Sequence, residues 1–393
     1  MARRSKKSAG FGLLRLFGSR RRRVGLIIAL LLFLGAQAVV AFVPYGDVPP
    51  ALQPAYLSVL AYRNKALARS GLPIDWYSSS ARVDTAGGDV QVYFAPSNSI
   101  DDRLVEFIES ATASVDVCVY DLDLPNVVAA LVAVHKRGLR VRLITDTDNL
   151  YLRELQPLKS AGIPIVDDGR EAIMHNKFVI VDGRRLWMGS YNFTDNGTHR
   201  NDNNALTIDS PLLAANYTTE FEEMWAGEFG PSSPAATPNP RVRVGDMELR
   251  TAFAPDDAVM SMILEAVGRA ESRVDLMAFS FTSDPLARAL RARAQDGVAV
   301  RCLFDARQAE NQYSEDEWLA KNGVDVRISA NRRGVMHHKV IIIDQRYVIT
   351  GSFNFSNAAD TANDENILLI DSPALAAVYA DEYERCWLGT KGY

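Results

Sequence analysis

The same set of chemically reactive side chains occurs twice in this 393-residue chain, with identical spacing. A histidine is followed two residues later by a lysine, then by an aspartate and by a Gly-Ser-x-Asn segment. Residues two apart on a β-strand point to the same face, so each imidazole should lie beside its ammonium group. The first set is His175, Lys177, Asp182, Ser190 and Asn192, and the second is His337, Lys339, Asp344, Ser352 and Asn354.

These side chains suit an attack on a phosphodiester. Lysine ammonium groups can neutralise the non-bridging oxygens, while serine hydroxyls and asparagine amides can hold the oxygens of the transition state. A neutral imidazole can act as a nucleophile near pH 7, and a protonated one can give its proton to the leaving oxygen. Because two ammonium groups supply the positive charge that Mg²⁺ would otherwise bring, we expect no metal and no other cofactor.

The two sets belong to a duplicated unit. The sequence FAP begins at residues 94 and 253, an offset of 159, and MHNKFVIVD from residue 174 matches MHHKVIIID from residue 336, an offset of 162. A period of this length indicates domain duplication rather than a solenoid. Apolar strands alternate with helical patterns in each copy, which predicts an α/β architecture with parallel strands. In the first copy the expected strands are 90–94, 114–120 and 140–145, followed by a hairpin of 177–181 and 185–188.

The duplicated sets resemble the H-x-K-x4-D-x6-G-S-x-N signature of the phospholipase D superfamily, and they fill every position of it twice. The resemblance covers approximately residues 89–393, and the compact repeats are similar to the endonuclease-like, bacterial branch. It implies tandem duplicated phospholipase D-like domains of α/β class, with mixed β-sheets flanked by helices and one active site at the pseudo-twofold interface. It also implies a covalent phosphohistidine intermediate without a metal cofactor. One chain would therefore carry a full site, whatever its oligomeric state.

The resemblance assigns a role to each residue of the two sets. His175 and His337 divide the roles of nucleophile and general acid or base, and family habit favours His175 as the nucleophile. Phosphate binding falls to Lys177, Lys339, Asn192 and Asn354, with hydroxyl donors expected from Ser190 and Ser352. Asp182 and Asp344 are implied to support catalysis, mainly by orienting other groups.

One further position distinguishes the two copies. In the superfamily an acidic residue often follows the Gly-Ser-x-Asn segment and steadies a catalytic histidine. Glu365 fits that place in the second copy, whereas its counterpart in the first copy is the uncharged Asn203. We therefore expect the two histidines to differ in basicity, with Glu365 and Asn203 as supporting residues.

The charge of the chain is divided unevenly. Residues 1–46 carry nine Lys or Arg and no acidic residue, whereas the remainder carries 34 basic and 48 acidic residues, a net charge of −14. An acidic body lacks the broad basic surface with which proteins grip nucleic acid, although a local site can still be basic. Three cysteines, an odd number, exclude a fold built on a disulfide framework.

Residues 24–43 contain no charged side chain and are long enough to cross a bilayer as a helix. Because arginines at 20–23 should stay in the cytoplasm, residues 1–23 would form a basic cytoplasmic tail and the catalytic part would lie outside the cytoplasm. A cleaved signal peptide is the alternative, since Ala36-Gln37-Ala38 has the form of a cleavage site. The remaining segments are predicted as a stem (44–88), a first repeat (89–230), a Pro-rich linker (231–245) and a second repeat (246–393).

Four functions are compatible with these features. A domain held beside a bilayer meets phospholipid head groups, so phospholipid hydrolysis is the leading hypothesis, with the membrane as a partner. A tethered or exported nuclease is the main alternative, because nucleic acid is also a phosphodiester. A cardiolipin-synthase-type phosphatidyltransferase and a non-catalytic binding module are less favoured, the latter because both residue sets are intact.

Overall fold

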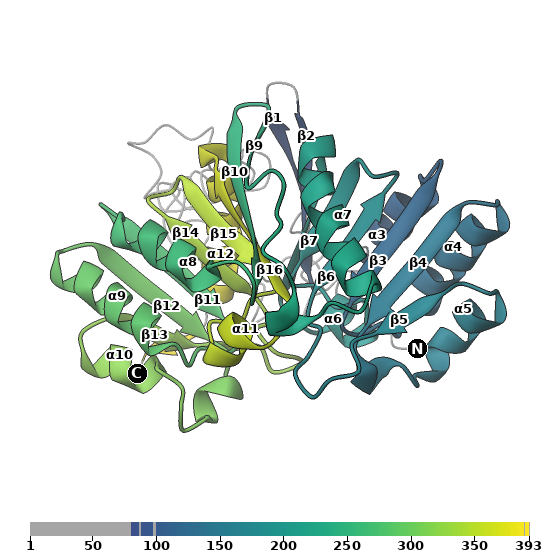
Figure 1. Ribbon diagram of the computed structural model, residues 1–393. Coiled ribbons are helices and arrows are strands. Elements are labelled where there is room, and N and C mark those ends of the chain that lie inside the picture. The colour runs from purple at the N-terminus through teal and green to yellow at the C-terminus, as the bar shows by residue number, and fades with distance from the viewer. Residues whose placement is uncertain (1–79, 86–87, 97–99, 389, 393) are drawn as a thin grey trace, which may run out of the picture.

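The computed structural model describes residues 80–393 except 86–87, 97–99, 389 and 393, and contains two helix-flanked sheets side by side (Figure 1). The predicted cytoplasmic tail, the apolar segment 24–43 and residues 44–79 of the predicted stem lie outside the described residues. Within the described part, no helix combines the length and the apolar character needed to cross a bilayer.

The first repeat forms an eight-stranded sheet of order β1-β2-β8-β7-β6-β3-β4-β5. Only β3, β4 and β5 run parallel, and the other neighbours pair antiparallel, so the sheet is mixed. Its elements are β1 (Ser80–Thr85), β2 (Gly88–Ala95), α3 (Ile100–Glu109), β3 (Ser114–Val119), α4 (Pro125–Lys136), β4 (Arg140–Thr145), α5 (Gln156–Ser160), β5 (Ile165–Asp167), β6 (Lys177–Val181), β7 (Arg185–Gly189), α6 (Asp195–His199), β8 (Asn203–Asp209) and α7 (Pro211–Trp225).

The second repeat follows the same plan in a nine-stranded sheet of order β17-β13-β12-β11-β14-β15-β16-β10-β9. Its elements are β9 (Arg241–Val244), β10 (Met247–Ala254), α8 (Val259–Gly268), β11 (Arg273–Ala278), α9 (Asp284–Gln295), β12 (Ala299–Phe304), α10 (Asp316–Lys321), β13 (Asp325–Ile328), β14 (Lys339–Ile343), β15 (Tyr347–Gly351), α11 (Asn357–Thr361), β16 (Glu365–Asp371), α12 (Pro373–Trp387) and β17 (Lys391–Gly392).

Two predicted segment boundaries differ from the strands observed. β1 lies within the predicted stem, and β9 lies within the predicted Pro-rich linker. In β9 the valines Val242 and Val244 are buried, while Arg241 and Arg243, which alternate with them, are exposed. This alternation lets a short segment rich in arginine pair with β10 and still contribute to the core.

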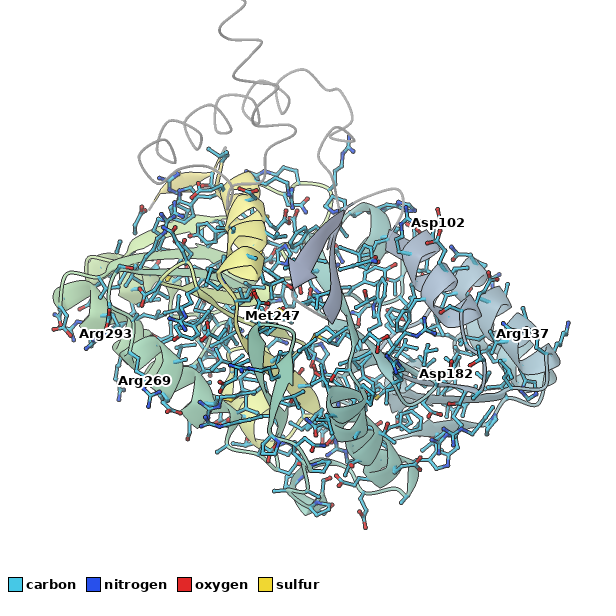
Figure 2. All side chains as sticks on the ribbon, turned by 90° about the horizontal axis from the view of Figure 1, so that it is seen from above. Asp102, Arg137, Asp182, Met247, Arg269 and Arg293 are labelled. Atoms are coloured by element: carbon cyan, nitrogen blue, oxygen red, sulfur yellow. The ribbon has the colours of Figure 1, made fainter. Side chains whose placement is uncertain are left out.

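A shared core fixes the two repeats against each other. α7 packs on β6 and β7 of its own sheet and on β10 of the other repeat, while α12 packs on β14 and β15 and also on β1. Their apolar faces join one cluster with residues of both sheets, among them Tyr217, Tyr379 and Met247, which is labelled near the centre of Figure 2. Separate outer cores lie beneath α3 and α4 in the first repeat and beneath α8 and α9 in the second (Figure 1). A site at the interface is thus built on rigid elements.

Candidate active site

Each motif histidine is positioned by the repeat to which it does not belong. The backbone N–H of His175 donates to the carbonyl of Asp364 at 2.9 Å, and the backbone N–H of His337 donates to the carbonyl of Asp202 at 2.9 Å. Both histidines lie two residues before the start of a central strand, β6 or β14, and both side chains are at least nine-tenths buried. The two sequence sets therefore meet at the boundary between the repeats.

The two imidazoles have chemically different partners. Nδ1 of His175 lies 2.8 Å from both carboxylate oxygens of Glu365, whereas Nδ1 of His337 lies 2.8 Å from the amide oxygen of Asn203. Each partner comes from the opposite repeat. An oxygen at Nδ1 favours the tautomer with hydrogen on that nitrogen, which leaves the Nε2 lone pair for substrate. Nε2 of neither ring has a hydrogen-bond partner among the residues described.

The two lysines are buried beside the histidines. Lys177 donates to the carbonyl of His175, and Lys339 donates to the carbonyl of His337 at 2.9 Å. Neither lysine is more than 1% exposed. The backbone bonds leave other donors of each ammonium group free to contact an anion.

An aromatic ring supports the histidine and lysine in each half. Tyr120 lies edge-to-face against His175, and Phe279 lies in the same way against His337. The Nζ atoms of the two lysines are 5.4 Å and 4.8 Å from the centroids of these rings. Sequence reasoning missed both aromatic residues, although their recurrence at an offset of 159 could have revealed them.

The site holds more positive than negative groups. Burial lowers the pKa of Lys177 to about 7 against the opposing effect of Glu365, and burial together with Lys177 lowers the pKa of Lys339. Burial and the two lysines also lower the pKa of His175. Burial raises the pKa of Glu365 to about 8 although Lys177 opposes that rise. A bound phosphodiester anion would relieve this shortage of negative charge.

The asparagines and serines of the Gly-Ser-x-Asn segments differ in their hydrogen-bond partners. Oδ1 of Asn192 and Oδ1 of Asn354 are buried without a hydrogen-bond partner in the described structure, so these amides are available to a ligand. Ser190 instead donates to the Oδ1 atom of Asn203 at 3.1 Å, and Ser352 hydrogen-bonds Glu365. The expected phosphate-binding role of Ser190 and Ser352 does not fit, because both hydroxyls are fully buried and already hold the partners of the histidines.

The motif aspartates lie outside the site, although the resemblance implied that they support catalysis by orienting other groups. Asp182 and Asp344 follow the far ends of β6 and β14, about 16 Å along the strand from the lysines at a rise of about 3.3 Å per residue. Asp182 accepts hydrogen bonds from the backbone N–H groups of Thr112, Ala113 and Ser114, and Asp344 makes the matching contacts in the second repeat. Both have positive φ, 57° and 53°. They fix the turns before β3 and β11, and Figure 2 labels Asp182.

The motif glycines are required by a close backbone approach. Gly189 and Gly351 have φ of 150° and 156°, and a Cβ atom on them would lie 2.3 Å and 2.1 Å from the carbonyl oxygens of Asn204 and Asn366. Only glycine allows β7 and β15 to approach the next strand this closely. This contact brings Asn203 and Glu365 beside the serines that hold them.

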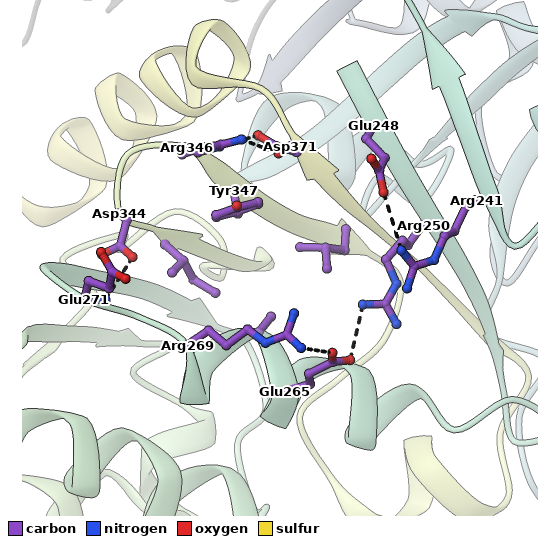
Figure 3. Close-up of a pocket in the computed structure, with 13 residues that line it drawn as sticks. Arg241, Glu248, Arg250, Glu265, Arg269, Glu271, Asp344, Arg346, Tyr347 and Asp371 are labelled. Atoms are coloured by element: carbon purple, nitrogen blue, oxygen red, sulfur yellow. Dashed lines mark hydrogen bonds and ion pairs between the residues drawn. The ribbon is translucent and has the colours of Figure 1, made fainter. Parts of the chain in front are cut away.

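An open pocket on the second repeat is separate from this site (Figure 3). Its four arginines are each paired with a carboxylate, as in the contacts of Arg269 with Glu265 at 2.7 Å and of Arg346 with Asp371 at 2.7 Å. Arg241 and Arg250 are paired with Glu248 and Glu265. Because acids balance the arginines, this pocket does not have the positive excess of the histidine-lysine site.

Comparison with known proteins decides the family. A family model described as "Cardiolipin synthase, PLD-like domain" matches residues 104–225 and 263–387, one segment in each repeat and together more than half of the chain. The chain belongs to the phospholipase D superfamily. The mixed sheets and tandem domains that the sequence resemblance implied are thereby confirmed.

Superfamily relatives match the chain over part of its length. It is 36% identical over 133 residues to a mitochondrial cardiolipin hydrolase of Xenopus tropicalis, covering 33% of this chain and 63% of that protein. It is 35% identical over 144 residues to a phospholipase D of Rickettsia felis, covering 37% of this chain and 70% of that protein. Among solved structures, phosphatidylserine synthase of Haemophilus influenzae has a TM-score of 0.61 at 13% identity, covering 84% of this chain and 92% of that protein, and so supports the fold.

Proposed function

We propose that the protein is a phosphodiesterase of the phospholipase D type that hydrolyses phospholipid head groups through a covalent phosphohistidine on His175. The observation that carries the proposal is the pairing of His175 with Glu365 and of His337 with Asn203, beside two buried lysines. A carboxylate can stabilise a positive charge on the imidazole that it holds, whereas an amide oxygen only orients its imidazole, so the two histidines can take different roles.

In the first step, Nε2 of His175 attacks phosphorus while the bond from phosphorus to the leaving alcohol oxygen breaks. The positive charge that develops on the attacking imidazole would lower the pKa of Glu365 from its value of about 8 in the free site, and the ionised carboxylate then stabilises that charge. Burial and the two lysines lower the pKa of His337 in the free site, and a bound phosphate anion would raise it again. In its protonated form His337 gives a proton to the leaving oxygen, so that the alcohol departs neutral. Lys177 and Lys339 neutralise the non-bridging oxygens, which is the charge stabilisation that a metal-independent mechanism needs.

In the second step, water attacks the phosphohistidine. His337, now neutral, accepts a proton from the water as the new P–O bond forms and the P–N bond breaks. The products are a phosphomonoester and the regenerated pair of histidines, with His337 protonated again. The Nδ2 groups of Asn192 and Asn354 would donate to the phosphate oxygens in both steps.

Three observations favour a lipid over nucleic acid as the substrate. Relatives of the chain are named mitochondrial cardiolipin hydrolase and phospholipase D. Beyond residue 46 the chain has a net charge of −14, which disfavours binding to polyanionic nucleic acid. The apolar segment 24–43 would hold the catalytic part at a membrane, either as an anchor or, before cleavage, as a signal peptide.

The proposal is tested by assaying the purified chain in excess EDTA against vesicles of cardiolipin or phosphatidylcholine and, separately, against single-stranded DNA. We expect release of head group and phosphatidic acid from vesicles, with His175→Ala as the inactive matched control. Cleavage of DNA alone would contradict the lipid substrate. Activity that disappeared in EDTA well below the melting temperature of the EDTA-treated protein, and returned with Mg²⁺ or Zn²⁺, would contradict the metal-independent mechanism.

We also propose that residues 45–393 lie outside the cytoplasm. The arginines at 20–23 before the apolar segment support this orientation. A reporter enzyme that is active only outside the cytoplasm, fused after Tyr393, should be active. A reporter active only in the cytoplasm should be inactive at the same position, and activity there would contradict the orientation.

A further inference from the structure

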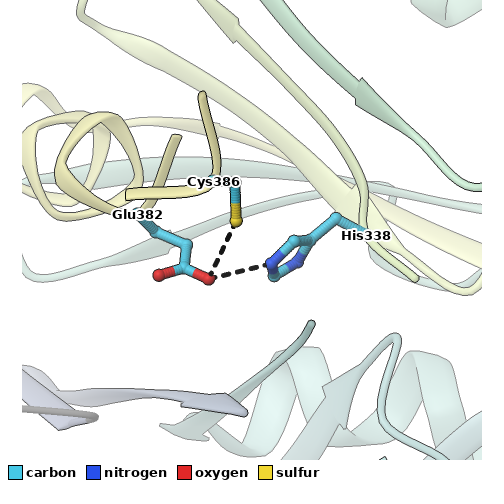
Figure 4. A group of neighbouring side chains, drawn as sticks. All are labelled: His338, Glu382 and Cys386. Atoms are coloured by element: carbon cyan, nitrogen blue, oxygen red, sulfur yellow. Dashed lines mark hydrogen bonds and ion pairs between the residues drawn. The ribbon is translucent and has the colours of Figure 1, made fainter. Parts of the chain in front are cut away.

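The repeats also differ at a buried carboxylate behind the active site. In the second repeat, Glu382 of α12 is fully buried. Its carboxylate lies 3.0 Å from Nε2 of His338 and 2.6 Å from the guanidinium of Arg385, and Cys386 lies beside it (Figure 4). Burial alone would raise the pKa of Glu382, but Arg385 and His338 lower it to about 2. This carboxylate is therefore neutralised by a cation built into the fold.

The matching carboxylate of the first repeat has no such cation. Glu220 of α7 stands 162 residues before Glu382, and its side chain is equally buried, since the residue is 3% exposed. The position of Arg385 is taken by Glu223, and that of His338 by Asn176. Within the described structure, the carboxylate of Glu220 makes no hydrogen bond or ion pair. A buried, unpaired carboxylate is costly unless a cation reaches it.

Two more carboxylates converge on Glu220. One carboxylate oxygen from each of Glu220, Glu223 and Asp256 lies within 4.8 Å of the other two. Oδ1 of Asp256 is buried without a hydrogen-bond partner among the described residues, and Glu223 accepts one bond from the hydroxyl of Ser233. Burial, followed by the charges of Asp256, Asp364 and Glu223, raises the pKa of Glu220, and burial raises that of Asp256 to about 7.

We propose that Glu220, Glu223 and Asp256 bind a hard divalent cation of the Ca²⁺ or Mg²⁺ class, which takes the place that the Arg385 guanidinium has in the second repeat. Carboxylate oxygens are the preferred ligands of these ions, and oxygens at about 2.4 Å from Ca²⁺ can be at most about 4.8 Å apart. The three oxygens of this cluster meet that limit.

The ion has a structural role. Asp364, whose charge acts on Glu220, uses its backbone carbonyl to hold the backbone N–H of His175. Neutralising the cluster thus stabilises the boundary between the repeats on the side that positions His175. The ion does not contact the phosphodiester, so the histidines and lysines still carry out the chemical step.

Ion binding is tested by calorimetric titration of the EDTA-treated full chain, in detergent, with CaCl2 and separately with MgCl2. We expect one ion per chain for at least one of the two metals. That metal should also raise Tm by about 5 °C at a concentration near 100 times Kd. Glu220→Gln and Asp256→Asn should each weaken binding at least tenfold, because each removes a charged ligand. The matched control is Glu265→Gln, which removes a surface acid of the second repeat and should bind the ion normally.

A charge reversal provides the sharper test. Glu223→Arg places in the first repeat the cation that Arg385 provides in the second, so it should abolish ion binding and raise Tm in EDTA above that of the EDTA-treated wild type. Absence of binding by the wild-type chain for both metals would overturn the proposal. So would binding that survives Glu220→Gln, or an ion that changes the hydrolysis rate well below Tm without changing Tm.

Discussion

The half-sites around His175 and His337 share almost everything except one side chain. Each has a histidine held by the backbone of the other repeat, a buried lysine and an aromatic ring beneath them. The histidines differ in that one imidazole faces the carboxylate of Glu365 and the other the amide of Asn203. An amide oxygen can orient an imidazole, whereas a carboxylate can also stabilise its positive charge. Duplication can therefore supply the geometry of a two-histidine mechanism, and a single substitution can divide its chemical roles.

Among the changes that leave the nucleophile in place, the largest expected effect comes from removing the histidine that faces the amide. His337→Ala should slow hydrolysis of phosphatidylcholine by about 10²- to 10⁴-fold, because the leaving oxygen loses its general acid. Formation of the covalent intermediate from bis(p-nitrophenyl) phosphate should be nearly unchanged, since p-nitrophenolate leaves without a proton. Single-turnover kinetics on both substrates measure the difference. Equal losses on the two would show that the half-sites do not divide the roles as proposed.

Changing the partner residues of the two histidines should lower kcat by smaller factors, which should differ between the half-sites. Glu365→Gln should lower kcat by about 10²-fold, because the amide cannot neutralise a charged His175, whereas Asn203→Ala should cost about tenfold or less. Steady-state kinetics at several pH values would measure both variants. A larger loss for Asn203→Ala would reverse the assignment of the two halves.

The pH dependence of stability should also differ between these variants. Burial raises the pKa of Glu365 to about 8 from an ordinary value of 4.5. Between these values the folded protein holds a proton that the unfolded chain releases, so this group's contribution to stability should fall as pH rises from about 4.5 to about 8. Denaturant unfolding across this range should show the fall in wild type and in Asn203→Ala. The slope should be weaker in Glu365→Gln, and an unchanged slope would contradict a buried, protonated Glu365.

Binding of an anion should draw protons into the site. The pKa of Lys177 is lowered to about 7 by burial, and a phosphate anion beside it would raise that pKa again. At pH 8 we therefore expect uptake of a substantial fraction of one proton when inorganic phosphate binds. Calorimetry in buffers of different ionisation enthalpy would measure it, and Lys177→Met should reduce it. Binding by the wild type without proton uptake would be inconsistent with a neutralised lysine.

The smallest effect on catalysis is expected at the motif aspartates. Asp182→Asn and Asp344→Asn should each lower the free energy of unfolding by about 1–3 kcal/mol, because each weakens several hydrogen bonds to backbone N–H groups. At temperatures well below Tm, kcat should stay within about twofold of wild type. Chemical denaturation and steady-state kinetics on the same samples would check both. A large loss of kcat with unchanged stability would show that these aspartates contribute to catalysis.

The sequence was sufficient to predict the features that depend on local spacing. The duplicated motif predicted the pairing of histidine with lysine, and the Asp-Gly turn predicted the hairpin of β6 and β7. Alternation along the chain also explains why His338 lies on the opposite side from His337, where it contacts Glu382 behind the site. The inequality of Glu365 and Asn203 was visible because the two copies could be aligned.

The sequence could not predict contacts that depend on three-dimensional pairing. Asp182 lies in the duplicated spacing of the motif, yet that spacing extends along a whole strand and takes its side chain away from the histidine. From the sequence alone, the hydroxyl of Ser190 could have faced the substrate or the next strand. In the structure the close approach of Gly189 to β8 places this hydroxyl within hydrogen-bond distance of the backbone N–H of Asn204. Tyr120 lies far from the motif in sequence, so its contact with His175 follows from strand order rather than spacing.

The division of roles between the two histidines is tested most directly by trapping the covalent intermediate. Each variant would be mixed briefly with a phosphodiester substrate, quenched under alkaline conditions that preserve phosphohistidine, and mapped by mass spectrometry. The account predicts an adduct on His175 in the wild type, accumulation of that adduct in His337→Ala because its hydrolysis lacks a general base, and no adduct in His175→Ala. An adduct on His337 in the His175→Ala protein, or no adduct in any variant that still turns over substrate, would contradict it.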